Sequence, residues 1–331
     1  MGRVAALLAA ALLAAGAAGC GGDGAEPGAP VGATIVLDFT PNAVHSGIYA
    51  AQQEGFYRDA EIDLTIREPG ESTDAPKLLE AGRVDFAILD IHDLGIAREH
   101  GLDVVGLTPI VERPLASVIA RGGGPVRRPR DLDGHTVGVT GLPSDEAVVD
   151  SEVSADGGDP AGVERVTIGF NAVASLAAGK VDAATGFWNA EGVALREQGV
   201  PIRIFKLDEY GAPPYPELVL VASGEMLESH PELIRRMVFA TYRGYAVARE
   251  NPTRALDDLL ESVPALDRAE QAAQMRVLRG AFLDSPIGPP SFRRGILERW
   301  SRWDVEHGLL ERPVDVGAAF DLLELKIHRS G

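Results

Sequence analysis

A carboxylate, an amide, an imidazole and a phenol follow one short apolar run, and these groups can hydrogen-bond to a small ligand. The run 35–37 suits a buried parallel strand, which ends at Asp38. Asn42 is placed to cap a helix that continues through His45 and Tyr49. In open α/β sheets, ligands bind beyond the carboxyl ends of strands, against helix N-termini. We therefore expect these four side chains at or near a binding site; the alternative is an ordinary strand–turn–helix with a polar turn.

Other polar and aromatic residues follow later predicted strands or flank the loops beside them. Aromatic rings can cover the face of a flat heterocycle, while Asn, Asp and Glu can hydrogen-bond to its edge. The further candidate binding residues are Phe39, His92, Asp93, Ser144, Asn171, Trp188, Asn189, Glu191, Tyr210 and Tyr215. Two of them have simpler alternatives, since Trp188 can fill the core and Glu191 can be a solvated acid at a helix start.

Acidic residues at predicted helix starts bear on the charge of the ligand. Sulfate, sulfonate and nitrate bind best where a helix N-terminus offers bare N–H groups. The helix after Pro143 instead begins with Asp145 and Glu146, and Glu191 lies at another candidate start. Such acids more often complement the helix dipole than contact a ligand. Their presence still disfavours an anion and suits a neutral or cationic ligand rich in N–H donors.

The chain has no strong signature of catalysis, metal binding or nucleic-acid binding. Its seven histidines and one cysteine contain no His-x-x-x-His or Cys-x-x-Cys spacing, and His92 and His100 are isolated surface candidates. A Walker loop and a G-x-S-x-G elbow are also absent. The net charge of -18 disfavours the phosphate contacts that dominate nucleic-acid binding. We therefore expect no catalytic residue, no metal, no cofactor and no nucleic acid.

Two consecutive series of strands and helices are predicted, which indicates an α/β fold. The first series contains strands 34–38, 62–66 and 84–89 and helices 43–54 and 73–82. The second contains strands 135–140, 164–168 and 182–186 and helices 144–156 and 172–180. The second repeats the first, because LLEAGRVDFAI at 78–88 matches SLAAGKVDAAT at 175–185. Two right-handed βαβ lobes are the simplest account, and coincidence of a common local pattern is the alternative.

Two further apolar runs, 115–121 and 218–222, have the pattern expected of crossing strands in a hinge between the lobes. The chain beyond the second run is amphipathic helix by spacing and would complete the first lobe. We therefore expect lobe 1 to comprise 33–118 and 222–331, and lobe 2 to comprise 119–221. A cleft between two hinged lobes is a common place for a small-molecule site.

The N-terminus carries an export pattern. Arg3 precedes the apolar run 4–18, which is too short to span a bilayer and is followed by small residues. We expect 1–20 to be a signal peptide, and 21–32, which is rich in Gly, Ala and Pro, to be a flexible tether. Because Cys20 is the only cysteine, the chain forms no internal disulfide.

The end of this segment, Ala17-Ala18-Gly19-Cys20, resembles the lipobox of bacterial lipoproteins. The resemblance implies that Cys20 becomes acylated and is the first residue of the mature protein. Ala17 stands where the lipobox usually has leucine. The alternative is a plain signal peptide that is cleaved elsewhere.

A longer set of motifs resembles one protein family. The motifs are Leu37-Asp38-Phe39-Thr40-Pro41-Asn42 with His45 and Gly47-Ile48-Tyr49, Gly82-Arg83-Val84-Asp85, Val137-Gly138-Val139, Ile168-Gly169-Phe170-Asn171, Phe187-Trp188-Asn189-Ala190-Glu191-Gly192, and Tyr210-Gly211 with Pro216-Glu217-Leu218. With them the chain resembles substrate-binding proteins of bacterial ABC importers, in the group related to thiamine-pyrimidine precursor synthase. The resemblance covers nearly the whole mature chain. It implies a two-lobe periplasmic-binding-protein fold of type II, in which each lobe is a mainly parallel sheet flanked by helices.

The same resemblance implies the ligand and the absence of catalysis. Members with this opening motif are linked to formylaminopyrimidine or hydroxymethylpyrimidine, although Phe39 replaces their usual tryptophan. Riboflavin, nitrate and alkanesulfonates are the alternative ligands. The group also includes a single-turnover enzyme that uses pyridoxal phosphate and its own histidine. Leu89 and Asp93 stand where that enzyme has its lysine and its histidine, and 211–215 replaces its cysteines, so we expect a binding protein and not an exported enzyme.

We therefore expect a monomeric extracytoplasmic binding protein, anchored to the bacterial cell membrane through lipid on Cys20. It would capture a small heterocycle, above all a pyrimidine precursor of thiamine, and deliver it to an ABC permease and its ATPase subunit. Glu191, or Asp38 as the second choice, would accept the paired N–H donors of a protonated 4-aminopyrimidine. Trp188 or Tyr49 would cover the face of the ring.

Overall fold

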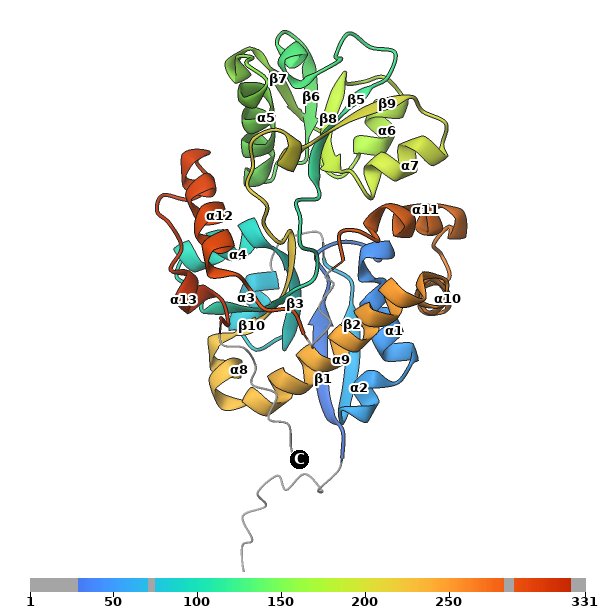
Figure 1. Cartoon of the computed structure of the whole chain (residues 1–331), viewed down its shortest axis with the longest axis vertical. Helices are drawn as coiled ribbons and strands as arrows, with labels where there is room; N and C mark the ends of the chain where they lie inside the picture. The colour runs from blue at the N-terminus through green and yellow to red at the C-terminus, as the bar shows by residue number, and fades with distance from the viewer. Residues whose placement is uncertain (1–28, 71–74, 283–288, 323–331) are drawn as a thin grey trace, which may run out of the picture.

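The computed structural model describes residues 29–70, 75–282 and 289–322, and it contains two five-stranded sheets (Figure 1). The first sheet contains, in spatial order, β2 (Ile62–Arg67), β1 (Val31–Val36), β3 (Phe86–Asp90), β10 (Leu218–Ser223) and β4 (Val104–Pro109). The second contains β7 (Glu164–Thr167), β6 (Thr136–Val139), β8 (Ala183–Phe187), β5 (Ala116–Arg121) and β9 (Ile202–Lys206). We call the part of the chain around the first sheet lobe 1, and the part around the second lobe 2.

The two sheets have the same topology, as the repeat in the sequence predicts. In lobe 1, β1 pairs parallel with β2 and β3, and β10 pairs antiparallel with β3 and β4. In lobe 2, β6 pairs parallel with β7 and β8, and β5 pairs antiparallel with β8 and β9. The antiparallel strand, β10 in lobe 1 and β5 in lobe 2, therefore occupies the corresponding position in the two sheets. The predicted α/β class is confirmed.

The repeated motif makes the same contacts in each lobe. Gly82 and Gly179 end their helices with φ of 61° and 67°, a backbone region that favours glycine. The aspartate three residues later returns to the first strand of its sheet. Asp85 accepts the backbone N–H of Thr34 in β1 (2.7 Å), and Asp182 accepts that of the first residue of β6 (3.2 Å). The motif thus fixes the helix end to the sheet in both lobes.

The runs 115–121 and 218–222, predicted as crossing strands, lie inside the sheets instead. Each forms a strand that is paired on both sides, β5 in lobe 2 and β10 in lobe 1. The backbone leaves one sheet for the other between Pro109 and Ala116, and again between Lys206 and Leu218. Both crossings come a few residues before the predicted lobe boundaries, because hydrogen-bond pairing holds these strands within one sheet.

Helices cover both faces of each sheet. Lobe 1 contains η1 (Ala43–His45), α1 (Ser46–Gln53), α2 (Phe56–Asp59), α3 (Ala75–Glu80), α4 (Ile91–Glu99), α8 (Gly224–Ser229), α9 (Pro231–Glu250), α10 (Pro252–Ser262), α11 (Arg268–Leu278), α12 (Arg294–Glu306) and α13 (Val316–Ala319). Lobe 2 contains η2 (Pro129–Leu132), α5 (Pro143–Ala155), η3 (Pro160–Gly162), α6 (Ala172–Ala177), α7 (Glu191–Glu197) and η4 (Leu207–Glu209). In the described part of the chain, every helix is too short or too polar to cross a membrane. The helices after β10 return to lobe 1, as predicted.

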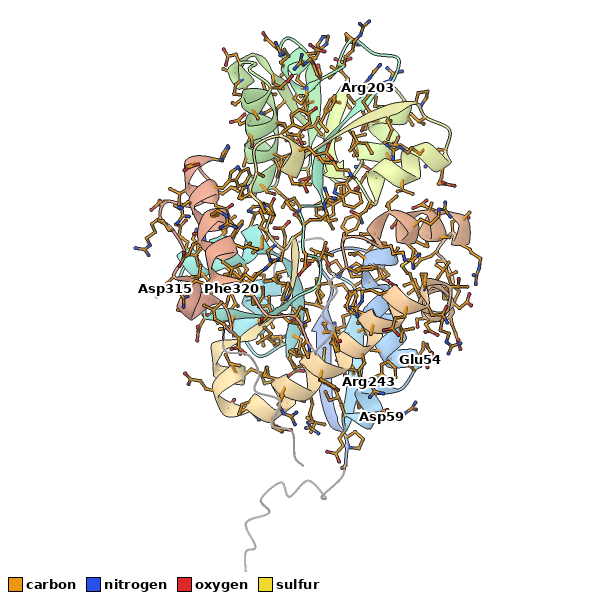
Figure 2. All side chains as sticks on the ribbon, viewed as in Figure 1. Glu54, Asp59, Arg203, Arg243, Asp315 and Phe320 are labelled. Carbon is orange, nitrogen blue, oxygen red and sulfur yellow. The ribbon has the colours of Figure 1, made fainter. Side chains whose placement is uncertain are left out.

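Alternate residues of each strand face opposite helix layers. Ile35 on β1 belongs to the core shared with α1 and α9, whereas Val36 belongs to the core shared with α4 and α12. In the second core, the ring of Phe320, which Figure 2 labels, lies 5.9 Å from that of Trp300 at 90°. On the opposite side, Arg243 of α9 and Asp59 of α2 form an exposed ion pair at 3.5 Å (Figure 2). The long C-terminal helices thus close both faces of lobe 1.

Two glycines allow α9 to lie directly against α1. A Cβ on Gly244 would lie 1.9 Å from the carbonyl oxygen of Gly47, and a Cβ on Gly47 would lie 2.4 Å from the ring of Tyr245. A larger side chain would displace the backbone of α1 if placed at Gly244, and the ring of Tyr245 if placed at Gly47. The contact holds α1, and the binding turn that precedes it, against the C-terminal part of lobe 1.

The N-terminal predictions fall mainly outside the described residues. The signal peptide, Cys20 and most of the tether lie there. The end of the predicted tether is instead ordered, because Val31 and Gly32 already pair with β2 as the start of β1.

Candidate ligand-binding cleft

A cleft lies between the lobes, where the carboxyl ends of parallel strands from both sheets meet. This is the place that the topology of open α/β sheets predicts. From lobe 1 it is lined by the predicted residues Asp38, Phe39, Asn42, His92 and Asp93. From lobe 2 it is lined by the predicted residues Ser144, Asn189 and Glu191. The remaining predicted residues, His45, Tyr49, Asn171, Trp188, Tyr210 and Tyr215, are not among its lining residues.

His45 lies behind the cleft and holds Asp38. The N–H of Asn42 donates to Nδ1 of His45 (3.2 Å), so this nitrogen is an acceptor and the proton of the neutral ring is on Nε2. Nε2 then donates to Oδ1 of Asp38 (2.8 Å). The amide oxygen of Asn42 accepts the N–H of Val44 (3.0 Å), the helix cap that the sequence predicts. The turn therefore presents a carboxylate to the cleft and uses the histidine to orient it.

Trp188 does not cover the cleft, which corrects its predicted role. Its ring is buried with 4% exposure, and Nε1 donates to the carbonyl of Pro114 (3.0 Å) in the first interlobe crossing. Nζ of Lys206 lies 4.5 Å from the ring centroid. Trp188 and Lys206 line a separate hollow, together with Arg113 of the crossing. Tyr49 is likewise buried in the core, and burial, followed by the charge of Glu68, raises its pKa to about 12.

Phenylalanines from both lobes meet at the cleft. The rings of Phe39 and Phe170 lie 5.4 Å apart with an interplanar angle of 57°, and both residues line the cleft. Phe170 has 61% of its surface exposed, which is unusual for a large apolar side chain. The predicted binding residue is its neighbour Asn171, but the side chain of Asn171 donates to the carbonyl of Ile168 (2.9 Å). Phe170 differs from other large apolar residues because its side chain is exposed, close to the end of a strand. The periodic pattern of the sequence does not reveal such exposure.

Asp145 shapes the lobe 2 wall of the cleft. One carboxylate oxygen accepts the hydroxyl of Thr140 (2.6 Å) and the N–H groups of Gly141 (2.9 Å) and Leu142 (3.1 Å). The other accepts the hydroxyl of Thr185 (2.6 Å). Both carboxylate oxygens of Asp145 are thus hydrogen-bonded within the protein. This agrees with the prediction that acids at this helix start more often interact with the helix N-terminus than with a ligand.

Glu191 and Asn189 present acceptors at the end of β8. Oε2 of Glu191 accepts the N–H of Phe187 (2.9 Å), which fixes the carboxylate at the cleft. Burial raises the pKa of Glu191, although backbone N–H groups oppose this shift. Asn189 is 1% exposed, and its Oδ1 has no hydrogen-bond partner among the described residues. A buried acceptor without a donor is costly, so the site suits a ligand that supplies one.

His92 is buried, which corrects its prediction as a surface residue. Nδ1 lies 2.9 Å from Oδ1 of Asp304 on α12, and Nε2 lies 3.0 Å from the hydroxyl of Tyr215. Burial opposes a charge on the ring, but the charges of Asp304 and then Asp90 raise the pKa of His92 to about 10. Tyr215, a predicted binding residue, is fully buried beneath the cleft as a partner of this imidazolium. The remaining predicted tyrosine, Tyr210, packs edge-on against Phe205.

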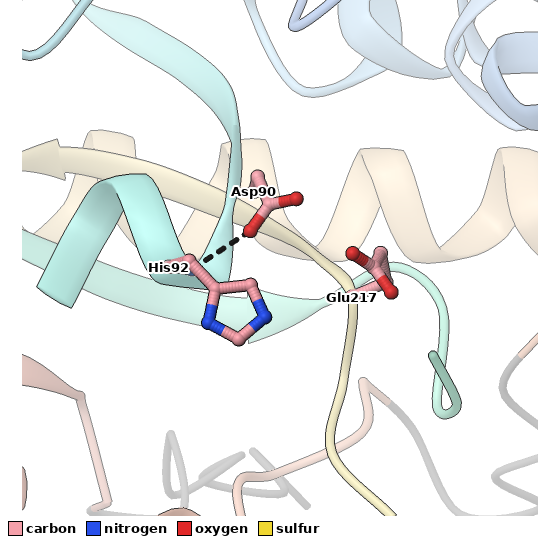
Figure 3. Close-up of side chains that lie close together, drawn as sticks. All are labelled: Asp90, His92 and Glu217. Carbon is pink, nitrogen blue, oxygen red and sulfur yellow. Dashed lines mark hydrogen bonds between the residues drawn. The ribbon is translucent and has the colours of Figure 1, made fainter. Parts of the chain in front are cut away.

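Two further carboxyl groups, Asp90 and Glu217, lie beside His92 (Figure 3). Their ligand atoms and those of His92 all lie within 4.8 Å of one another, as in some metal sites. Both ring nitrogens of His92 already have hydrogen-bond partners, Asp304 and Tyr215, whereas a metal ligand needs a ring nitrogen with a free lone pair. Neither acid is among the predicted binding residues, although Glu217 directly precedes a predicted strand and Asp90 directly follows one.

The cleft as a whole is acidic. Its lining carboxyl groups are Asp38, Asp90, Asp93, Asp145, Glu191 and Glu217. No lysine or arginine lines it among the residues that the structure describes. The acids favour ligands with N–H donors or positive charge, and an anion there would face carboxylates without a matching cation.

We expect Asp93→Asn to raise the melting temperature by several degrees at pH 8 and by much less at pH 5. Burial, then the charge of Asp90, raises the pKa of Asp93 from 3.8 to about 7, against the charge of His92. Between these two pKa values the folded state binds more protons than the unfolded state, so this carboxyl group lowers stability as pH rises towards 7. Asparagine removes that loss.

Thermal unfolding at the two pH values tests this prediction. Asp63→Asn, at an exposed position on β2, is the control and should change the melting temperature equally at both pH values. A larger gain for Asp93→Asn at pH 5 than at pH 8 would contradict the assignment.

The chain is similar to proteins named as binding proteins and to proteins named as synthases. The model of the NMT1/THI5 like family matches residues 42–255. A formylaminopyrimidine-binding protein of Halalkalibacterium halodurans is 32% identical over 295 residues, which cover 86% of this chain and 88% of the relative. A 4-amino-5-hydroxymethyl-2-methylpyrimidine phosphate synthase of Legionella pneumophila is 28% identical over 236 residues, covering 70% of this chain and 74% of the relative.

Solved structures show the same fold. The alkanesulfonate-binding protein SsuA from Xanthomonas axonopodis pv. citri, bound to MOPS, superposes with a TM-score of 0.71 and 15% identity. The match covers 88% of this chain and 99% of that protein. The chain therefore has the periplasmic-binding-protein fold, as the family resemblance implies. At this identity the likeness concerns the fold and not the ligand.

Proposed function

This chain belongs to the NMT1/THI5 like family, and we propose that it is the extracytoplasmic solute-binding protein of an ABC importer. It acts as a monomer that captures a pyrimidine precursor of thiamine and delivers it to a permease with an ATPase subunit. The similarity to a formylaminopyrimidine-binding protein over most of both chains supports this role. The likeness to a synthase is shorter and weaker in identity.

The observation that carries the choice of ligand is the excess of acceptors in the cleft. Six carboxyl groups line it, and the buried Oδ1 of Asn189 has no donor among the described residues. A 4-aminopyrimidine supplies an exocyclic NH₂ and, when protonated, a parallel ring N–H. Nitrate and alkanesulfonates supply no such donors and carry the wrong charge for these walls.

Within this cleft, Glu191 is our first choice for the residue that accepts the N–H donors of the pyrimidine ring, and Asp38 is our second. Glu191 is fixed by the N–H of Phe187, and Asp38 is fixed by His45. Phe39 and Phe170 take the role of covering the ring face that the sequence reasoning gave to Trp188 or Tyr49, because they are the aromatic pair that lines the cleft from both lobes. Offset aromatic contacts of this kind add about 1 kcal/mol beyond the buried area.

Titration calorimetry of the purified protein tests the proposal. The ligands are 4-amino-5-hydroxymethyl-2-methylpyrimidine, riboflavin and hexanesulfonate. We expect the pyrimidine to bind with Kd of about 1 µM or below, a binding free energy of about −8 kcal/mol, and hexanesulfonate not to bind. Tight binding of hexanesulfonate or of riboflavin alone would overturn the choice of ligand.

The alternative function, an exported pyrimidine synthase, predicts chemistry on the bound molecule. Schiff-base chemistry with pyridoxal phosphate needs a lysine, and no lysine lines the cleft in the described part of the chain. Mass spectrometry after incubation with pyridoxal phosphate separates the two functions. We expect the protein to release its ligand unmodified; a new pyrimidine product, or a mass change in the protein, would favour the enzyme.

We further expect Cys20→Ala to move the protein from the membrane to the soluble fraction without changing its Kd. One diacylglyceryl group on the cysteine would supply two acyl chains, enough for stable attachment. Fractionation of cells that express either form, followed by calorimetry on the soluble form, is the measurement. A variant that stays with the membrane would exclude lipid on Cys20 as the anchor.

A further inference from the structure

One carboxylate oxygen of Glu217 accepts backbone N–H groups, and the other has no hydrogen-bond donor among the described residues. Oε2 accepts the N–H of Leu115 (2.5 Å) and, at 3.4 Å, that of Ala116. Oε1 is buried and has no hydrogen-bond partner among the described residues. The side chain is fully buried, yet Glu217 is one of the residues that line the cleft. It therefore lies at the floor of the cleft with an acceptor that a ligand can use.

Asp90 faces the same position. Its Oδ1 accepts the N–H of His92 (2.7 Å) as the cap of α4, and its carboxyl group lies within 4.8 Å of that of Glu217 (Figure 3). Burial and then the charge of Glu217 raise the pKa of Asp90 well above its usual range. Burial also raises the pKa of Glu217, against the charge of His92. Two carboxyl groups this close in a dry site do not both ionise, so the pair holds one proton.

The charges that face this pair leave the floor negative. The imidazolium of His92 is matched by Asp304, and Tyr215 is a neutral phenol whose pKa burial raises well above its usual range. Asp93 and Asp38 are further carboxyl groups on the same side of the cleft. A positive group on the ligand would therefore be stabilised here more than a neutral one.

We propose that Asp90 and Glu217 form a floor subsite that takes a cationic amino group of the ligand in exchange for one proton. This inference rests on the proposed binding function and specifies what the ligand carries beside its ring. The ammonium group keeps its own protons and donates to Oε1 of Glu217 and to the carboxylate of Asp90. The proton that the pair shared leaves to solvent, so charge balances across the step.

The subsite predicts a preference between two ring compounds. We expect 4-amino-5-aminomethyl-2-methylpyrimidine, whose side chain is an ammonium at pH 7, to bind at least tenfold more tightly than its 5-hydroxymethyl analogue. Calorimetry in buffers with different ionisation enthalpies should show release of about one proton for the amine and none at this pair for the alcohol. The Kd of the amine should rise about tenfold for each unit that pH falls below the pKa of the pair.

Asp90→Asn is the decisive variant. Asparagine can still cap α4 through the N–H of His92, but it cannot share a proton with Glu217. We expect the variant to lose both the amine preference and the proton release. Asp63→Asn, which removes an exposed acid on β2 outside the cleft, is the control and should keep both. An unchanged preference in Asp90→Asn, or no proton release in the wild type, would overturn the subsite.

Two further experiments distinguish failure of the subsite from failure of the proposed function, and an amine site from a metal site. If neither pyrimidine binds the wild type, the proposed function fails, and benzylamine and benzyl alcohol then test the subsite alone by thermal shift. Stabilisation by benzylamine only, lost in Asp90→Asn, supports the subsite; equal effects of both compounds overturn it. Stabilisation by zinc chloride, lost in Asp90→Asn, would make Asp90, His92 and Glu217 a metal site and would also overturn it.

Discussion

Glu191→Gln is expected to weaken binding of 4-amino-5-hydroxymethyl-2-methylpyrimidine about thirtyfold or more, a loss of about 2 kcal/mol. In the proposed orientation, the carboxylate would accept two parallel N–H donors from the protonated ring edge, and charge-assisted bonds of this kind are about twice as strong as neutral ones. Glutamine keeps the volume but turns one acceptor into a donor that faces a donor. The acceptor for the N–H of Phe187 can be kept by the amide oxygen, so the fold should be preserved. Calorimetry measures the change in Kd.

Asp38→Asn is the comparison for this prediction. Asp38 lines the same cleft and is oriented by His45, but we assign it the second place. If Glu191→Gln binds as tightly as the wild type while Asp38→Asn loses binding, the role belongs to Asp38. If neither substitution changes the affinity, other residues accept the N–H donors of the ring and the proposed orientation is wrong.

The second large effect concerns stability. We expect His92→Leu to lower the free energy of unfolding by about 3–5 kcal/mol, because it leaves the buried Asp304 without its cation. Asp304 has no exposed surface, so water cannot replace the imidazolium. Urea unfolding followed by fluorescence measures the loss.

A second variant separates the charge from the packing. His92→Leu combined with Asp304→Leu removes both charges and should recover at least half of the lost stability, since a buried ion pair replaced by apolar residues is often close to neutral. A double variant that is as unstable as the sum of the single changes would show that packing around the ring, and not the buried charge, supports this part of lobe 1.

The fold could be predicted from the sequence because its signals are local. Short apolar runs, helix-ending glycines and the repeated Gly-Arg/Lys-Val-Asp motif each act within a few residues, and the structure reproduces them in both lobes. The positions of β5 and β10 could not be predicted, because an apolar run reads the same at a hinge and inside a sheet. Only the pairing with distant strands distinguishes the two.

The part of the site formed by residues that follow strands could be predicted from the sequence. Asp38, Asn189 and Glu191 follow strands directly and line the cleft. His92 was misjudged because its partner Asp304 is 212 residues away, and no local pattern reports that contact. The pair of Asp90 and Glu217 arises in the same way, since the antiparallel register sets Leu218 opposite Asp90.

The central place of β10 in its sheet has a consequence for the order in which the protein folds. All five strands of lobe 2 come from the continuous segment 116–206. Lobe 1 has a gap between β3 and β4 until residues 218–223 are available to pair, and until then both strands have an unpaired inner edge. Wherever the chain emerges from its N-terminus, the lobe that begins later in the sequence therefore has all its strands first. Until β10 follows, the apolar edges of lobe 1 are open to aggregation.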